Sequence, residues 1–364
     1  RATTSGAFSL AFLIFGLLGI LAGRMTDKWG ARVVEIACGV LLGVGYLLMS
    51  QVSSVWQLYL FYGAIIGAGM SGGDTPVLAT AARWFIKRRG TFTGLTKAGA
   101  GIGIFVIPPL ANWLIASYGW RNAYLVIAGI CLIGVVSVAL LYKRDPAEMG
   151  LLPDGAVKIE TTGQDMEIRQ YTFREMVRTR QFWILASAWF LVVFSVQIIL
   201  AHIVPHMTDL GLSPALAASI FGIIGVASII GRVGMGGVSD RLGKKRTLII
   251  AVAFMVAALS ILQFAREAWA FYLFAIVDGI SHGALFTVIS LVLAELFGLR
   301  SLGAALGAVL FSGTVGGAIG PVLAGYIFDV TGGYQLAFII CLAFSIIAIS
   351  LLPFVKPTGS KVHS

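Results

Sequence analysis

Apolar residues fall into long runs along the whole chain, and short polar segments separate these runs. The runs lack the single apolar stripe that is typical of a helix facing water. Many are about 20 residues long, which is the length that an α-helix needs to cross a bilayer. We therefore expect eleven membrane-spanning helices, at roughly residues 5–23, 33–51, 54–86, 89–117, 120–142, 181–206, 213–237, 246–265, 268–297, 301–329 and 334–355.

One polar connection, residues 143–180, is much longer than the others and separates five spans from six. It divides the chain into an N-terminal helix bundle at 1–142, a central loop, a C-terminal helix bundle at 181–356 and a tail at 357–364. With the loop and the C-terminus in the cytoplasm, 21 of the 26 Lys and Arg residues fall on cytoplasmic segments. This asymmetry follows the positive-inside rule and predicts a multi-pass protein of the plasma or inner membrane.

Composition supports the membrane interpretation. A soluble domain has about 25% charged residues, whereas this chain of 364 residues has 12% and is 58% hydrophobic. Its mean hydropathy is +0.94 and its pI is about 9.7. The excess basic charge lies at the predicted inner face, so we expect no nucleic-acid partner. The three cysteines lie singly in apolar segments, and no nucleophile–base pair, nucleotide loop or metal spacing is present. We therefore expect no enzyme activity, no metal and no cofactor.

Two short segments repeat each other at a fixed distance. Residues 23–32 are GRMTDKWGAR and residues 236–246 are GGVSDRLGKKR, so that Asp27 and Asp240 lie 213 positions apart. Further similarities at nearly the same offset indicate a duplicated six-helix unit. The span at 181–206 has no counterpart in the first half, which predicts that one helix of a twelve-helix protein is missing ahead of the sequence.

Each repeated segment has the form Gly, then Asp-Arg/Lys-x-Gly, then basic residues, and each lies between two predicted spans. On this motif the chain is identified as a member of the major facilitator superfamily. The resemblance implies an all-α, polytopic 6+6 helix fold, here with helix 1 missing and eleven spans visible. It also implies alternating access, in which two bundles rock about a site near the midplane.

Within that superfamily the sequence resembles the monocarboxylate and oxalate–formate group, which implies a carboxylate substrate. The matching segments are Arg83-Trp84-Phe85, Lys87-Arg88-Arg89-Gly90, Pro108-Pro109, Gly119-Trp120-Arg121, Arg144-Asp145-Pro146 and Gly231-Arg232. The sequence departs from the group at two places. Ser228 stands where animal-type monocarboxylate carriers have an Asp, four residues before the Arg. No Lys or Arg lies between Ser301 and Leu352, where the oxalate–formate exchanger has a Lys.

Two basic residues lie inside predicted spans, where a charge costs at least about 2.5–3.5 kcal/mol. The planar guanidinium of Arg232 can bind a carboxylate through two parallel hydrogen bonds, which makes Arg232 the first candidate for substrate binding. Alternatively, it forms an ion pair near the inner face. Lys97, roughly 12 Å into its span at 1.5 Å per residue, can supply a second positive charge or extend to the inner surface.

Titratable residues inside the spans are candidates for proton coupling. Asp278 and His282 lie four residues apart and therefore share one face of their helix. Histidine titrates near physiological pH, so this pair suits the co-transport of a proton. The alternative is a polar contact between helices. His282 is also a candidate substrate ligand, and Asp74 can pair with Lys97 or Arg232.

The span at 181–206 borders the central cavity by family analogy. Gln197 and His202 are therefore candidate substrate ligands. His206 lies four residues later, near the predicted outer end, where it is close enough to water to be an interface residue.

Four charged residues lie at predicted cytoplasmic ends of spans, namely Asp27, Arg83, Asp240 and Glu295. The family resemblance implies a gate, in which these residues hold the cytoplasmic side closed and separate when the cavity opens inward. The alternative is a set of solvated ion pairs, each worth about 0–1 kcal/mol.

Together these features predict a secondary active transporter of a small organic anion, monomeric in the lipid bilayer, with either proton symport or anion exchange. Two alternatives remain open. An efflux carrier for drug-like or cationic compounds would depend on acidic residues and would not need Arg232. A non-transporting membrane receptor or assembly factor would move no ligand, and it would have no need for two gating loops.

Overall fold

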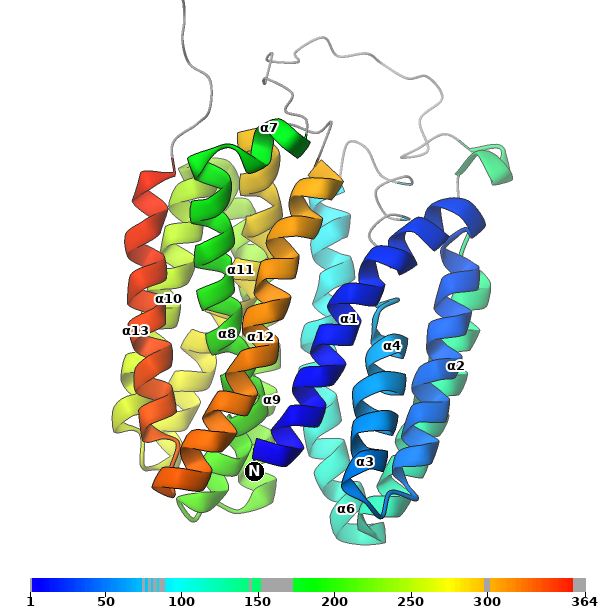
Figure 1. The fold of residues 1–364 in the computed structure, drawn as a ribbon, viewed down its shortest axis with the longest axis vertical. Helices are drawn as coiled ribbons and strands as arrows, with labels where there is room; N and C mark the ends of the chain where they lie inside the picture. Colours follow the sequence, from blue (N-terminus) through cyan, green and yellow to red (C-terminus); the bar gives the residue numbers. More distant parts are fainter. Residues whose placement is uncertain are drawn as a thin grey trace, which may run out of the picture. The chain divides into compact units, whose positions relative to one another are not determined.

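A computed structural model describes residues 2–73, 76, 77, 80, 84, 89–143, 146–151, 173–297 and 302–355. These residues form helices, turns and short connections without a β-strand (Figure 1), which confirms the all-α fold class. The first half contains α1 (Ala2–Trp29), α2 (Ala31–Met49), α3 (Val55–Leu58), the π-helix η1 (Tyr59–Ile66), α4 (Gly67–Met70) and α6 (Arg89–Leu141). The rest contains the 3-10 helix η2 (Pro146–Met149), α7 (Phe173–Val177), α8 (Arg180–Asp209), α9 (Pro214–Leu242), α10 (Lys244–Phe264), α11 (Ala268–Phe297), α12 (Leu302–Thr331), α13 (Gln335–Leu351) and the 3-10 helix η4 (Leu352–Phe354).

The chain folds into two compact units. The first consists of Arg1–Gly99, Val106–Ile159 and Ala318–Gly332. The second consists of Ala100–Phe105, Glu160–Gly317 and Gly333–Ser364. Each unit thus includes one short segment from the other half of the sequence.

Eight helices of the described chain are long and apolar enough to cross a membrane. One of them, Leu95–Leu141, contains two predicted spans, because the chain turns at Gly119, whose φ of 78° is non-helical. Two shorter apolar helices, Thr3–Gly19 and Val55–Met70, coincide with further predicted spans. Every predicted span therefore contains helical residues, as a multi-pass membrane protein requires.

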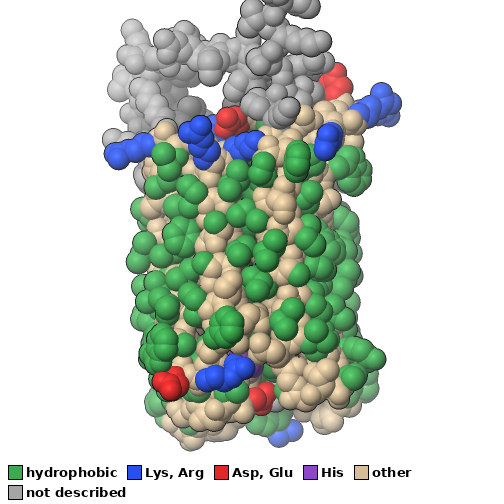
Figure 2. All heavy atoms as spheres, turned by 90° about the vertical axis from the view of Figure 1, so that its left-hand side faces the viewer, with side chains coloured by type: hydrophobic (Ala, Val, Ile, Leu, Met, Phe, Trp, Pro, Cys, Tyr) green, Lys and Arg blue, Asp and Glu red, His purple; other side chains and the backbone are tan. Residues whose placement is uncertain are grey.

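The surface of the second unit is apolar where a lipid-facing surface is expected. Figure 2 shows one of its faces, where apolar side chains cover the middle and Lys, Arg, Asp and Glu gather at the two ends. Phe264, Ile339 and Ile346 are among the exposed apolar residues. A soluble monomer rarely exposes so continuous an apolar surface.

The two repeated segments have the same backbone conformation. Gly30 has φ 85° and ψ 158°, and Gly243 has φ 86° and ψ 146°. The amide of Gly30 donates to the carbonyl of Thr26 at 2.9 Å, and the amide of Gly243 donates to the carbonyl of Ser239 at 3.1 Å. Glycine readily adopts a positive φ. A glycine at this position therefore lets the chain turn directly from one helix into the next in both repeated segments.

The third visible span is irregular. The sequence predicts one span over residues 54–86, but α4 ends at Met70 and the chain turns at Ser71–Gly73. Residues 76 and 77 are helical again. Gly72 and Gly73 favour the interruption because glycine is a poor helix former, and Pro76 lacks the amide that a continuous helix would use. The predicted span thus contains helical residues on both sides of an interruption that the apolar pattern did not predict.

Helices α9 and α11 pack through backbone contacts at glycines. A Cβ on Gly231 would collide with the backbone of Ile280, and a Cβ on Gly283 would collide with the carbonyl of Ser228. A Cβ on Gly279 would lie 2.5 Å from the carbonyl oxygen of Ile224. Small residues allow membrane helices to approach this closely.

We expect Gly283→Ala to destabilise the second unit, because the added methyl group has no room beside Ser228. Overpacking of this kind costs about 1–3 kcal/mol. Gly234→Ala is the matched control, since a Cβ at Gly234 of α9 would meet nothing within 4 Å and alanine favours a helix by roughly 0.5–1 kcal/mol. Thermal unfolding in detergent, followed by exposure of the buried Cys341 thiol, measures the difference. Equal melting temperatures would contradict the packing described here.

Candidate functional site

A buried basic side chain, Arg232, lies at the glycine contact between α9 and α11. Only 5% of its surface is exposed. A Cβ on Gly283 of α11 would come within 2.8 Å of the Arg232 backbone nitrogen. This close approach places His282 of α11, which is also buried, within electrostatic range of Arg232. Two residues that the sequence singled out are thus brought together from different helices.

Aromatic rings continue from His282 across the second unit. The ring of His282 lies 5.0 Å from that of Phe286, one turn further along α11. Phe286 makes an edge contact with Trp189 of α8 at 5.1 Å and 73°. Trp189 in turn packs against Gly313 of α12. A Cβ on Gly313 would lie 2.6 Å from the Nε1 atom of Trp189. Arg232, His282, Phe286 and Trp189 therefore form one row, which we call the Arg–aromatic row.

The Arg–aromatic row combines two kinds of chemistry. A guanidinium group binds a carboxylate through charge-assisted hydrogen bonds, and aromatic faces accommodate the apolar part of a small molecule. Sequence reasoning missed Phe286 and Trp189, because neither differs by charge or spacing from the other aromatic residues in apolar spans.

Asp278 has different neighbours. It is buried on α11 and lies within electrostatic range of Cys341 on α13. The hydroxyl of Ser195 on α8 donates to the Cys341 carbonyl at 3.4 Å. Asp278 thus interacts electrostatically with α13, and His282 with α9. The coupling role of this pair stays a prediction.

The two histidines of α8 pack against α13. The Nδ1 atom of His202 lies 3.2 Å from the hydroxyl of Tyr334. The ring of His206 lies 5.0 Å from Phe338 and 6.0 Å from Phe271. The sequence placed His206 near water, but only 6% of it is exposed. His206 lies three residues before the end of α8, so its place near the outer end stays a prediction, while aromatic side chains pack against its ring.

Two further positions on α8 and α9 bear on the predicted site. Gln197 is buried on α8. Ser228, one turn before Arg232, is fully buried, and its hydroxyl donates to the carbonyl of Gly225 at 2.8 Å. A Cβ on Gly101 would lie 2.8 Å from the same hydroxyl oxygen. The position that holds an Asp in animal-type carriers is thus occupied by a hydroxyl bonded to its own helix.

The remaining predicted residues are only partly described. Asp74, Arg83 and the side chains of Asp27 and Asp240 lie outside the described residues. Glu295 is exposed near the end of α11, where it lines a void of about 20 Å³ with Lys245, Val292, Leu296 and Val355. The gate therefore stays a prediction. Lys97 is half-buried on α6 and belongs to the first unit, whereas Arg232 belongs to the second.

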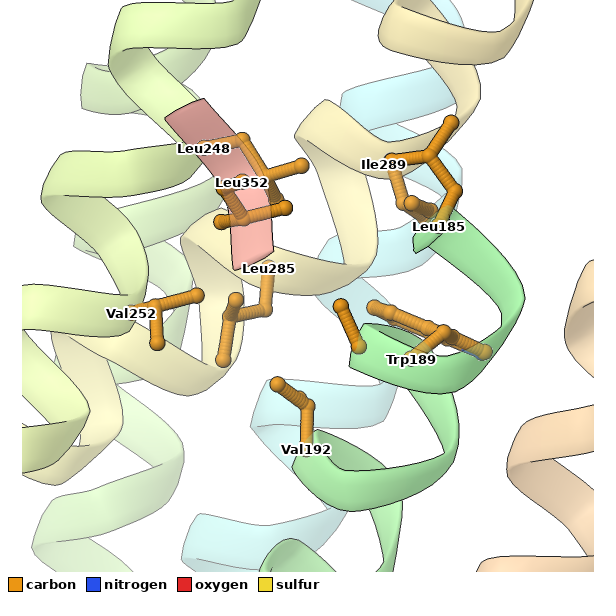
Figure 3. A pocket seen from close by; sticks show the side chains of 9 residues that line it. Leu185, Trp189, Val192, Leu248, Val252, Leu285, Ile289 and Leu352 are labelled. Atoms are coloured by element: carbon orange, nitrogen blue, oxygen red, sulfur yellow. The ribbon is translucent and has the colours of Figure 1, made fainter. Parts of the chain in front are cut away.

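A second small void lies inside the second unit and is entirely apolar (Figure 3). Its volume is about 10 Å³, and it is lined by Leu185, Ala188, Trp189, Val192, Leu248, Val252, Leu285, Ile289 and Leu352. This volume is about that of one water probe, and a water molecule needs polar partners. The void is therefore a packing defect between α8, α10, α11 and η4, and it cannot hold an anion.

One buried acid in the first unit was missed. Glu35 of α2 is 6% exposed, and its Oε1 atom lacks a hydrogen-bond partner within the described part of the chain. The signal was present in the sequence, because Glu35 is an acidic residue inside the apolar span predicted at 33–51.

Comparison with known proteins places the chain in a family. The model of the Major Facilitator Superfamily matches residues 1–265 and, in an overlapping second match, residues 203–364. Monocarboxylate transporter 13 of Rattus norvegicus is 30% identical over 327 residues, which cover 89% of this chain and 73% of that protein. Monocarboxylate transporter 12 of Homo sapiens is 27% identical over 376 residues, which cover 96% of this chain and 72% of that protein. The chain therefore belongs to the major facilitator superfamily, and within it resembles the monocarboxylate transporters.

Proposed function

We propose that the protein is a secondary active transporter that moves a small monocarboxylate-like anion across the membrane by alternating access. The observation that carries this proposal is the Arg–aromatic row, in which buried Arg232 lies within electrostatic range of His282 and the ring of His282 packs against Phe286. The names of the relatives, monocarboxylate transporters 12 and 13, support the substrate class. A buried charge is expensive in hydrocarbon, so binding of a carboxylate gives Arg232 a role that packing does not.

Transport of an anion requires compensation of its charge. A co-transported proton or exchange against a second anion can supply this compensation. Asp278, His282 and Asp74 are the proposed proton carriers, and Lys97, Gln197 and His202 are proposed to contribute to substrate binding. Asp27, Arg83, Asp240 and Glu295 are proposed to form the cytoplasmic gate. The functional unit is proposed to be a monomer.

The proposed orientation places the central loop and the C-terminus in the cytoplasm. The Nζ atom of Lys245, at the start of α10, donates to the carbonyl of Pro353 at 2.7 Å. The guanidinium of Arg180, at the start of α8, lies 5.9 Å from the ring of Phe354. These contacts gather basic residues at one end of the second unit, and basic residues favour the cytoplasmic side.

We expect Arg232→Gln to abolish most anion uptake into proteoliposomes containing the full-length protein. Loss of a charge-assisted hydrogen bond costs about 1.5–3 kcal/mol, which weakens substrate binding roughly 10- to 100-fold. Arg232→Lys keeps the charge but not the planar fork, so it should recover only part of the uptake. Arg178→Gln, at an exposed site of the same unit, is the control. A panel of short 2-hydroxy and 2-oxo carboxylates and benzoate provides the probes. Unchanged uptake by Arg232→Gln would favour the efflux-carrier alternative.

Uptake should respond either to an inward proton gradient or to a preloaded anion inside the vesicles, because net movement of the anion alone would build up charge. The measurement compares initial rates at two external pH values, with and without internal anion. Rates that ignore both conditions would exclude symport and exchange alike.

We expect Arg178→Cys to react with an impermeant maleimide only after the cell membrane is permeabilised, and Glu267→Cys to react in intact cells. Both residues are exposed, Arg178 between α7 and α8 and Glu267 between α10 and α11. The parent protein is the control, because two of its three cysteines are buried and Cys131 is half-buried. The reverse labelling pattern would invert the orientation.

A further inference from the structure

Glu35 is a buried carboxyl group that the proposed transport site does not use. It is the fifth residue of α2, which begins at Ala31 and is apolar enough to span a membrane. Only 6% of its surface is exposed. Its Oε1 atom makes no hydrogen bond with any part of the chain that the structure describes. At this oxygen, an ionised carboxylate would have lost its water without gaining a partner among the described residues.

The surroundings of Glu35 are formed by the interruption of the neighbouring span. A Cβ on Gly72, in the turn that ends α4, would lie 3.7 Å from Oε2 of Glu35 and 2.8 Å from Sγ of Cys38. Glycine at this position therefore leaves space beside the carboxyl group. A buried apolar cluster on α1 and α2 consists of Ala22, Val34 and Cys38.

Among the side chains that the structure describes, the titratable groups near Glu35 do not compensate a negative charge. Cys38, one turn along α2, and Tyr142, at the end of α6, are within electrostatic range of Glu35. Neither side chain carries a positive charge at neutral pH. The charged side chains that lie outside the described residues include those of Arg24, Asp27, Asp74 and Arg83.

The chemistry of this site suits a proton better than a metal ion. Calcium takes six to eight oxygen ligands, and magnesium demands six in octahedral geometry. The nearby hydroxyl of Ser71 already donates to the carbonyl of Ala68 at 2.6 Å. The described residues contain no group of three or more His, Cys, Asp or Glu that could hold a metal.

We propose that Glu35 is a proton-binding site of the first unit. Its carboxyl group holds a proton while it is buried, as in this conformation. When the conformational change of transport exposes the group to water, the O–H bond breaks and the proton passes to a water molecule, which leaves the carboxylate. Reburial takes up a proton in the reverse step.

This proposal rests on the alternating access proposed above, because a static protein would not expose and rebury the group. It assigns the coupling ion, which the transport proposal left open. One proton per anion would let a pH gradient of one unit support about tenfold accumulation of the anion.

The test uses proteoliposomes with the full-length protein and a panel anion that the parent protein takes up. We expect Glu35→Gln to lose accumulation driven by the pH gradient and to keep counterflow, because exchange of anions does not require proton release. Glu267→Gln is the matched control, since Glu267 is exposed and its Oε2 accepts a hydrogen bond from Trp269 at 3.0 Å. Unchanged accumulation by Glu35→Gln overturns the proposal. Accumulation that is lost in Asp278→Asn but kept in Glu35→Gln overturns it as well. Loss of counterflow together with accumulation also overturns it, because it indicates a structural role.

A second measurement does not need a substrate. The infrared spectrum of the protein in lipid nanodiscs should contain the carbonyl band of a protonated, buried carboxyl group that is absent from Glu35→Gln and present in Glu267→Gln. A parent protein that shows this band but transports no anion would refute the transport proposal and leave the proton site supported. An identical band in Glu35→Gln would refute the proton site itself.

Discussion

The backbone contact between α9 and α11 determines where the charged groups of the second unit lie. Gly231, Gly279 and Gly283 remove the side chains that would separate the two helices. In a bilayer, lipid tails are as apolar as leucine, so helices associate through close packing and polar contacts and not through hydrophobic exclusion from water. A larger residue at Gly283 would move α11 away from Ser228 and thereby separate His282 from Arg232. The same small residues that hold the bundle together therefore place a cation beside an imidazole.

Polar groups of the second unit occupy two distinct environments. Arg232 and His282 lie between α9 and α11, with aromatic rings on one side. His202 and His206 lie between α8 and α13, where Tyr334 and neighbouring phenylalanines enclose them. The first environment brings the permanent charge of Arg232 together with a titratable ring and aromatic side chains, and an anion with a small apolar body matches that combination. In the second environment Arg266 lies within electrostatic range of His206, and the rings of Tyr334 and Phe338 pack against the histidines.

The sequence predicted the fold because the bilayer imposes a length on each apolar run, and because the duplicated turns at Gly30 and Gly243 need the same residue type. It could not predict the interruption around η1 and Ser71–Gly73 in full, since hydropathy does not distinguish a π-helix from an α-helix. The aromatic neighbours of His282 were also beyond reach, because Trp189 of α8 meets Phe286 of α11 only through the packing of these helices. Glu35 could have been found from the sequence, because it is an acidic residue inside an apolar run. The structure adds that its side chain is buried.

Ser228 and Glu35 together constrain how a proton could accompany the anion. In animal-type monocarboxylate carriers an acid precedes the arginine by one helical turn, and the present chain has a hydroxyl there that donates to Gly225. A proton cannot be stored at that position, because the hydroxyl has no acid–base chemistry near neutral pH. Coupling by symport then requires a titratable group elsewhere, such as His282 or a carboxyl group. Asp278 offers one in the second unit, and Glu35 offers one in the first. A carboxyl group in the first unit would take up and release its proton as that unit changes conformation, so proton and anion would be coupled through the conformational change.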